Sequence, residues 1–413
     1  MMGANISTLS SPDNCGPLNA NSGPATFDAW MQGVSKEFET VAGMSDKMPY
    51  SAPLARAVLI NFETTDDGER LMHILHHANP ERPAPEAYRL VRSAYVAQMR
   101  HRKEPRFPDG YTTVDECLRG VRWAQTTFPY ANRLNEILRN FNLSTTIWQR
   151  YNVMRFLGPL MMHRTGSERI RGDIGCSDFT GSKAVVLSDM DSKFRFDPVD
   201  VLEEKGRLWV PSKDKSDLFE EIAAQPDQAS RTIGVDRVDP TDPIVADFIE
   251  GSLTPEEIKD GALPTRHDKL LRARVPEGKL KFVQADIARQ SGVKKVLEEA
   301  GGLLDEAYMI LAWHQGGARK RRATFGNLGR LVSLEKPVVI VDFARRDTNG
   351  DKPYLSVLSD WTKGLNVFVQ IDGELYRPLQ WTDGRCRAVK ICPDLAKVAK
   401  GGPYEKQVRE LLA

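Results

Sequence analysis

The sequence predicts an α+β protein with a mainly helical N-terminal half and a strand-containing C-terminal region with antiparallel hairpins. Two patterns indicate this class. From residue 25 to about 163, apolar side chains recur at three- and four-residue steps, which is the period of an α-helix. Beyond residue 337, apolar and polar residues alternate, and Asp-Gly pairs at 372–373 and 383–384 are typical of tight hairpin turns.

These patterns divide the chain into four segments. In the helical segment, Phe27, Trp30 and Val34 begin one apolar stripe. The stretch 183–196 has the composition of a strand, and 197–265 is rich in Asp and Pro. The segments are a polar N-terminal arm at 1–24, a helical domain at 25–163, a loop-rich connecting region with a few strands at 164–279, and an α/β C-terminal domain at 280–413.

Charge and composition exclude some classes of protein. Lys and Arg total 57 against 56 for Asp and Glu, so the whole surface is not built to bind nucleic acid or an anionic membrane. The first 24 residues lack the pattern of a signal peptide, and no stretch approaches the roughly 20 apolar residues of a membrane span. We therefore expect a soluble protein of the virion or host cytoplasm. Its scattered cysteines predict free thiols: Cys15, Cys117, Cys176, Cys386 and Cys392.

A local basic cluster lies in an otherwise balanced chain. Four adjacent cations occur between glycines in the stretch 316–332. Such a cluster can contact phosphates, and arginine offers bidentate geometry there, although a charge run is also typical of a solvated face. The prediction is a contact with nucleic acid, probably RNA, through Arg319, Lys320, Arg321 and Arg322.

A second pattern suggests phosphoryl chemistry. Gly-Ser pairs at 166–167 and 181–182 precede the Asp-x-Asp spacing of Asp189 and Asp191. This resembles nucleotidyltransferases of the polymerase-β type, in which a Gly-Ser turn holds a nucleotide triphosphate and two carboxylates on one strand bind Mg²⁺. The resemblance implies that Ser182 or Ser167 contacts phosphate. The alternative is a turn-rich loop with solvated acids.

Two further patterns have simpler interpretations. His73 and His77 lie one helical turn apart, the step at which two imidazoles share a zinc ion, but no partner ligands follow. We interpret them as ordinary helix residues. The stretch 282–293 resembles the first helix and turn of a helix-turn-helix, and we interpret it as an amphipathic helix.

The hypothesis that conflicts with the fewest observations is that the chain is a structural protein. The stretch 25–38 resembles the start of the ordered core in coat proteins of flexuous filamentous plant viruses. The chain carries no Walker A, GxGxxG, GxSxG or HExxH motif. We therefore predict a self-assembling coat or nucleocapsid protein that forms a homo-oligomer, contacts no membrane, needs no cofactor and is not an enzyme. The alternative is the Mg²⁺-dependent nucleotidyltransferase.

Overall fold

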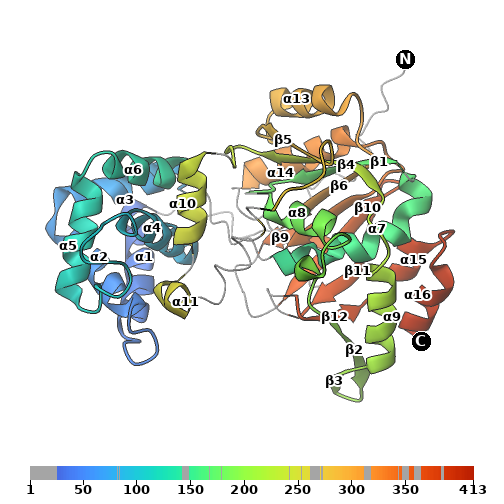
Figure 1. The fold of residues 1–413 in the computed structure, drawn as a ribbon, viewed down its shortest axis with the longest axis horizontal. Coiled ribbons are helices and arrows are strands. Elements are labelled where there is room, and N and C mark those ends of the chain that lie inside the picture. Colours follow the sequence, from blue (N-terminus) through green and yellow to red (C-terminus); the bar gives the residue numbers. More distant parts are fainter. Residues whose placement is uncertain are drawn as a thin grey trace.

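A computed structural model gives the fold for most of the chain. It describes residues 26–413 except 81, 83, 142–147, 167, 178, 241, 253, 261–269, 271–272, 311–317, 343, 347–352, 358–363 and 383–385. Figure 1 shows helices gathered in one body and the main sheet in another.

The first body consists of helices. Its apolar stripe is as predicted, because Trp30, Val34 and Phe38 are buried along one face of the first helix. Thr113 and Glu116 form a reciprocal capping box at the start of the fifth. The helices are α1 (Phe27–Ala42), α2 (Ser51–Thr64), α3 (Asp66–Ala78), α4 (Ala84–Met99), α5 (Val114–Thr126) and α6 (Tyr130–Asn140).

Two later helices join this body. They are α10 (Pro243–Gly251) and α11 (Pro255–Asp260). Ile244, Val245 and Phe248 of α10 belong to the same apolar core as α1–α6. The chain therefore leaves the sheet after one strand, contributes to the helical body, and returns to the sheet for the next strand (Figure 1).

In the described part of the chain, ten strands form one mixed sheet. Its order is β3-β2-β12-β11-β10-β7-β6-β1-β4-β5, and neighbouring strands from β7 to β5 are parallel. The strands are β1 (Arg169–Ile174), β2 (Asp200–Lys205), β3 (Leu208–Pro211), β4 (Ala229–Asp236), β5 (Leu280–Gln284), β6 (Glu306–Ile310), β7 (Val338–Asp342), β10 (Leu365–Ile371), β11 (Glu374–Trp381) and β12 (Ala388–Ile391). A separate pair joins β8 (Ala344–Arg346) to β9 (Pro353–Val357).

Helices cover both faces of the sheet. Along β7, Val339 and Val341 belong to one apolar core, whereas Val338 and Ile340 belong to another. Because successive side chains of a strand point to opposite faces, these cores lie on opposite sides. The first contains α7 (Asn152–Thr165), α8 (Thr180–Leu187), α9 (Lys213–Ala223), α15 (Leu395–Ala399) and α16 (Glu405–Leu412); the second contains α13 (Gln290–Ala300) and α14 (Ala318–Leu331). Two 3₁₀ helices are η3 (Trp148–Tyr151) and η4 (Ser192–Phe194).

The predicted fold class is confirmed, and the architecture is Rossmann-like α/β. Asp372 and Gly373 form the hairpin turn between β10 and β11, both with positive φ, whereas Asp383 and Gly384 lie outside the described residues. The strand predicted over 183–196 is wrong. Residues up to 187 form the end of α8, because a short apolar run carries no period that separates helix from strand. No helix among the described residues is long and apolar enough to cross a membrane.

Candidate functional site

The strand order defines one place where a ligand fits the fold. From β1 the chain adds β4 and β5 on one side, and then crosses to add β6 and β7 on the other. In open α/β sheets, ligands bind outside the carboxyl ends of the strands at such a switch point. The residues that end β1, β4 and β5 are therefore the candidates for a site.

The turn between β1 and α8 has an unusual backbone. Gly175, Ser177 and Phe179 all have positive φ, at 77°, 53° and 66°. Gly175 donates its backbone N–H to Val235 O at 2.7 Å, which ties the turn to β4. Left-handed conformations at non-glycine residues are strained and cluster at functional sites.

A buried carboxyl group lies beneath this turn. Asp173, near the end of β1, is 0% exposed. Ser182 donates its hydroxyl to Oδ2 at 2.6 Å, and Tyr151 donates to Oδ1 at 3.4 Å. Burial raises the pKa of Asp173 to about 7, against the opposing effect of both hydroxyls. Near neutral pH, this group therefore changes between its charged and neutral forms.

The turn is packed directly on β4. A Cβ on Gly234 would lie 2.5 Å from the ring of Phe179, so only glycine allows this ring to rest on the strand. A Cβ on Gly181 would likewise meet the ring of Tyr151 at 2.2 Å. Two glycines and two aromatic rings thus fix the turn and the start of α8.

Asp236 connects the same turn to the end of β4. Its Oδ2 accepts the backbone N–H of Ser177 at 2.9 Å, and its Oδ1 accepts that of Arg237 at 2.7 Å. Burial raises the pKa of Asp236, against these backbone hydrogen bonds. The carboxylate is held in a fixed position beside the turn.

A third carboxylate follows β5. Asp286 accepts the backbone N–H of Ala288 at 3.0 Å, and its backbone is packed so closely on Gly292 that a Cβ there would lie 2.2 Å from Asp286 O. Lys320 Nζ lies 3.8 Å from Asp286 Oδ2. The carboxyl edge therefore presents Asp173, Asp236 and Asp286 in the spatial order of their strands.

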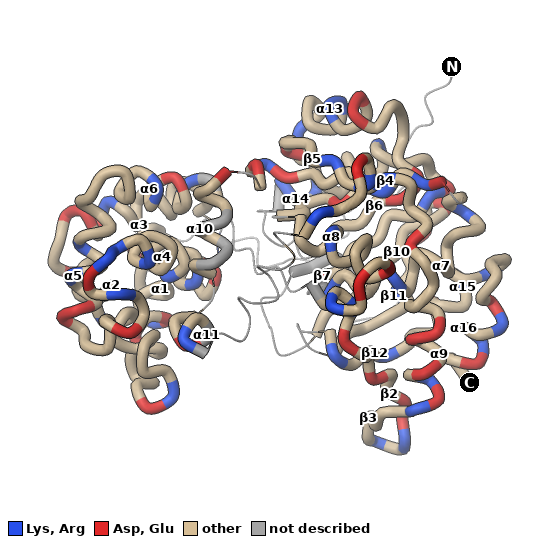
Figure 2. The backbone as a smooth tube through the Cα atoms, in the orientation of Figure 1, with Lys and Arg blue, Asp and Glu red and all other residues tan. Residues whose placement is uncertain are grey.

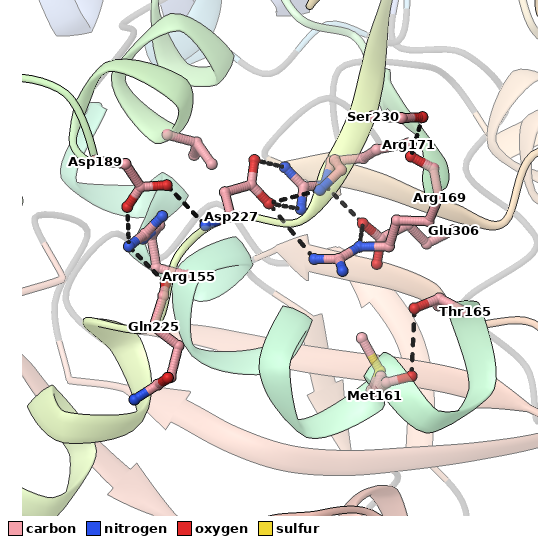
Figure 3. Close-up of polar contacts among 12 residues, drawn as sticks. Arg155, Met161, Thr165, Arg169, Arg171, Asp189, Gln225, Asp227, Ser230 and Glu306 are labelled. Atoms are coloured by element: carbon pink, nitrogen blue, oxygen red, sulfur yellow. Dashed lines mark hydrogen bonds and ion pairs between the residues drawn. The ribbon is translucent and has the colours of Figure 1, made fainter. Parts of the chain in front are cut away.

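A buried network of charges supports the switch point from below (Figure 3). Arg169 and Arg171, which lie on the same face of β1 as Asp173, both donate from Nε to Glu306 Oε1 of β6 at 2.7 Å. Asp227, before β4, accepts two further hydrogen bonds from Arg171 at 2.7 and 3.0 Å. Strands β1, β4 and β6 are thus connected through charged side chains as well as their backbones.

The residues of the nucleotidyltransferase hypothesis have other roles. Ser182 lies in α8 and bonds Asp173, while Ser167 lies outside the described residues. Asp189 pairs with Arg155 at 2.7 Å (Figure 3), and Asp191 accepts the N–H of Lys193 at the start of η4. The two acids lie after a helix and not on a strand. In the part of the chain that the structure covers, no group of three His, Cys, Asp or Glu side chains is arranged to hold a metal.

The basic cluster lies at the start of α14. Lys320 is half-buried beside Asp286, and Arg322 is exposed. The side chains of Arg319 and Arg321 are outside the described set. Figure 2 shows both signs of charge interspersed over both bodies. These positions do not support the predicted contact between the cluster and a phosphate backbone.

The acids of the carboxyl edge were missed in the sequence. The stretch 282–293 is not the amphipathic helix interpreted above, because it contains the end of β5, Asp286 and only the start of α13. A signal was present, because an aspartate lies at or shortly after the end of each of the three stretches "RIRGDI", "TIGVD" and "FVQAD". Such acids after consecutive strands are typical of ligand sites in α/β sheets.

Comparisons of the chain with known proteins find similar solved structures but no matching family model and no matching curated protein. Among solved structures, it is similar to the N-methyltransferase NodS from Bradyrhizobium japonicum WM9 in complex with S-adenosyl-L-homocysteine, at 10% identity over 49% of this chain, with a TM-score of 0.23. That match covers 64% of the NodS chain, less than two thirds of it. An O-methyltransferase family protein from Burkholderia thailandensis is 15% identical over 74% of this chain and 83% of its own, with a TM-score of 0.24.

These findings correct the functional predictions. The coat or nucleocapsid function, its RNA binding and the nucleotidyltransferase alternative are wrong, as is the prediction that the chain is not an enzyme. The fold is a doubly wound α/β sheet with polar residues at its switch point, which is where α/β proteins of this kind bind their ligands. Self-association stays a prediction.

Proposed function

We propose that this chain is a methyltransferase-like enzyme that binds S-adenosylmethionine across the carboxyl ends of β1, β4 and β5. One observation carries the proposal: the strained turn after β1 is followed, strand by strand, by the fixed carboxylates Asp236 and Asp286. This succession matches the way a Rossmann-type sheet holds a nucleoside.

Each part of the ligand has a matching group. A carboxylate at the end of the second strand is suited to the ribose hydroxyls, which is the place of Asp236. The base then extends past β4 to the turn after β5, where Asp286 can accept from an exocyclic amine. The tail of the ligand extends the other way, to the turn at Gly175.

The charge of the site favours a cationic tail over a diphosphate. Asp173 and Asp236 both lie at the turn after β1, where a dinucleotide would place its phosphates. The Asp236 carboxylate, which accepts the Ser177 N–H of this turn, repels a diphosphate and attracts an ammonium or sulfonium group. Phe179 also occupies the turn and packs on Gly234. S-adenosylmethionine combines adenosine with a cationic tail, so the donor set fits it.

The cofactor, when bound, supplies an electrophilic methyl group. The residues of the chain would bind and orient it, with Asp236 holding the ribose and Asp286 the base. Asp173 does not contact solvent, so it acts on the turn through Ser182 and Tyr151 and does not reach the methyl acceptor.

Calorimetric titration of the full chain tests this proposal. The ligands are S-adenosylhomocysteine, NAD⁺ and ATP, and the variant is Asp236→Asn. We expect the wild type to bind S-adenosylhomocysteine in preference to the two phosphate ligands. The variant should bind it roughly 10- to 100-fold more weakly, since about 1.4 kcal/mol corresponds to each factor of ten.

A matched control separates binding from folding. Glu220 of α9 also accepts a backbone N–H, that of Val199 at 3.0 Å, but lies on the α9 face near β2. Glu220→Gln should bind S-adenosylhomocysteine as the wild type does. The proposal fails if the wild type shows no binding at millimolar ligand, or binds NAD⁺ or ATP more tightly.

A further inference from the structure

The first turn of α14 carries a lysine that the proposed cofactor site has not yet used. Lys320 Nζ lies 3.8 Å from Asp286 Oδ2, longer than the roughly 2.7–3.2 Å of a hydrogen bond. The two groups therefore face each other without a direct hydrogen bond. Their polar atoms remain able to bond a third group that donates to one and accepts from the other.

The two sides of this pair are held in place. Asn327 of α14 donates its amide to Ile287 O at 2.8 Å, which fixes the helix to the turn after β5. Asp286 is fixed in turn by the Ala288 N–H and by its packing on Gly292. The backbone elements that carry Lys320 and Asp286 are thus held against each other.

The surroundings of Lys320 are those of a binding group. Its side chain is 35% exposed, and burial lowers its pKa, followed by the effect of nearby Arg237. Asp236 and Asp286 both act electrostatically on this amine, in the direction that raises its pKa.

Resting on the proposed function, we infer that Lys320 and Asp286 together recognise the edge of an adenine base. Asp286 accepts from the exocyclic amine, and Lys320 donates to the ring nitrogen adjacent to that amine. Adenine presents a donor beside an acceptor, which matches an acceptor beside a donor on the protein. Lys320 would then determine which nucleoside the enzyme accepts.

A cycle of protein and ligand changes tests this inference. The ligands are S-adenosylhomocysteine and its 1-deaza and 7-deaza analogues, which each lack one ring nitrogen beside the amine. The proteins are the wild-type chain and Lys320→Met. The wild type should bind one of the two analogues roughly tenfold more weakly than the parent ligand, as expected for one lost hydrogen bond.

The variant gives the decisive comparison. Lys320→Met should bind the parent ligand roughly tenfold more weakly. It should no longer distinguish the parent ligand from that analogue, because removing the lysine and removing the ring nitrogen abolish the same hydrogen bond. Lys294→Met is the control, since Lys294 is 78% exposed and paired with Glu298 on α13. This control should reproduce the wild-type values, and the thermal midpoints of both variants should match that of the wild type.

The outcomes separate this inference from the function on which it rests. If the wild type binds S-adenosylhomocysteine but Lys320→Met loses no affinity, or still distinguishes the analogue, only the role of Lys320 is overturned. Tighter binding by the variant would also overturn it, because Lys320 would then compete with the ligand for Asp286. If the wild type binds no adenosyl ligand, both proposals fail.

Discussion

Removal of the Asp227 charge should lower the free energy of unfolding of the sheet body by a large amount for so conservative a substitution. Arg169 and Arg171 are 2% and 1% exposed, and they share the carboxylates of Asp227 and Glu306. Asp227→Asn leaves two buried guanidinium groups with one carboxylate. Breaking a buried pair by neutralising one partner costs about 3–5 kcal/mol.

The lowered pKa of Asp227 also indicates how strongly the two arginines stabilise its charge. Burial alone would raise its pKa, but the guanidinium groups of Arg171 and Arg169 hold it down at about 2, against an ordinary value of 3.8. That depression corresponds to about 2 kcal/mol. Because the folded pKa is lowered, this stability is present above about pH 4 and is lost as the pH falls towards 2.

Urea unfolding followed by tryptophan fluorescence tests the prediction. At pH 7, the free energy of unfolding of Asp227→Asn should lie about 2–5 kcal/mol below that of the wild type, and the gap should narrow between pH 4 and pH 2. Asp372→Asn is the matched control. Asp372 pairs with Arg164 at 2.9 Å but is 55% exposed and lies outside the network, so its loss should be at most about 1 kcal/mol. A loss below about 1 kcal/mol for Asp227→Asn would refute this account of the network.

Two other changes act at the turn after β1. Because burial raises the pKa of Asp173 to about 7, its charged form destabilises the fold, and that penalty grows as the pH rises from about 4 to about 7. Asp173→Asn should therefore raise the thermal midpoint at pH 8 but not at pH 4, and an equal shift at both values would contradict this reasoning. Gly234→Ala forces a methyl group onto the ring of Phe179, which should cost about 1–3 kcal/mol in urea unfolding and weaken S-adenosylhomocysteine binding. Unchanged binding by that variant would show that the position of Phe179 does not matter to the site.

The helical half could be predicted because its signal is local. Trp30, Val34 and Phe38 are spaced by the helical period, and that stripe is buried whatever it packs against. The hairpin at Asp372 and Gly373 was also predictable, since its residue types permit the positive φ that the turn requires.

The parallel sheet could not be predicted in the same way. Its strands are buried on both faces, so they show apolar runs without alternation, as in Val338–Asp342. Long crossovers separate them: β2, β3 and α9 intervene between β1 and β4, and α10 and α11 between β4 and β5. In the usual Rossmann unit an acid follows the glycine turn by roughly 20 residues, whereas here Asp236 lies much farther along the chain.

The candidate site was missed for a related reason. Asp173, Asp236 and Asp286 come together only when their strands lie side by side, and their order in the sheet does not follow from local pattern. The Asp-x-Asp pair was more conspicuous in sequence, yet Asp189 is engaged by Arg155 and Asp191 caps η4. Spacing alone cannot distinguish a ligand group from a structural one.

Hydrogen–deuterium exchange with and without S-adenosylhomocysteine tests the central claim most directly. The account predicts slower exchange on binding at three separate turns, around Gly175, Asp236 and Asp286, which follow β1, β4 and β5. Protection of all three together would place the nucleoside across the carboxyl edge. Protection confined to the helices α1–α6, or none at saturating ligand, would contradict the site and the function proposed from it.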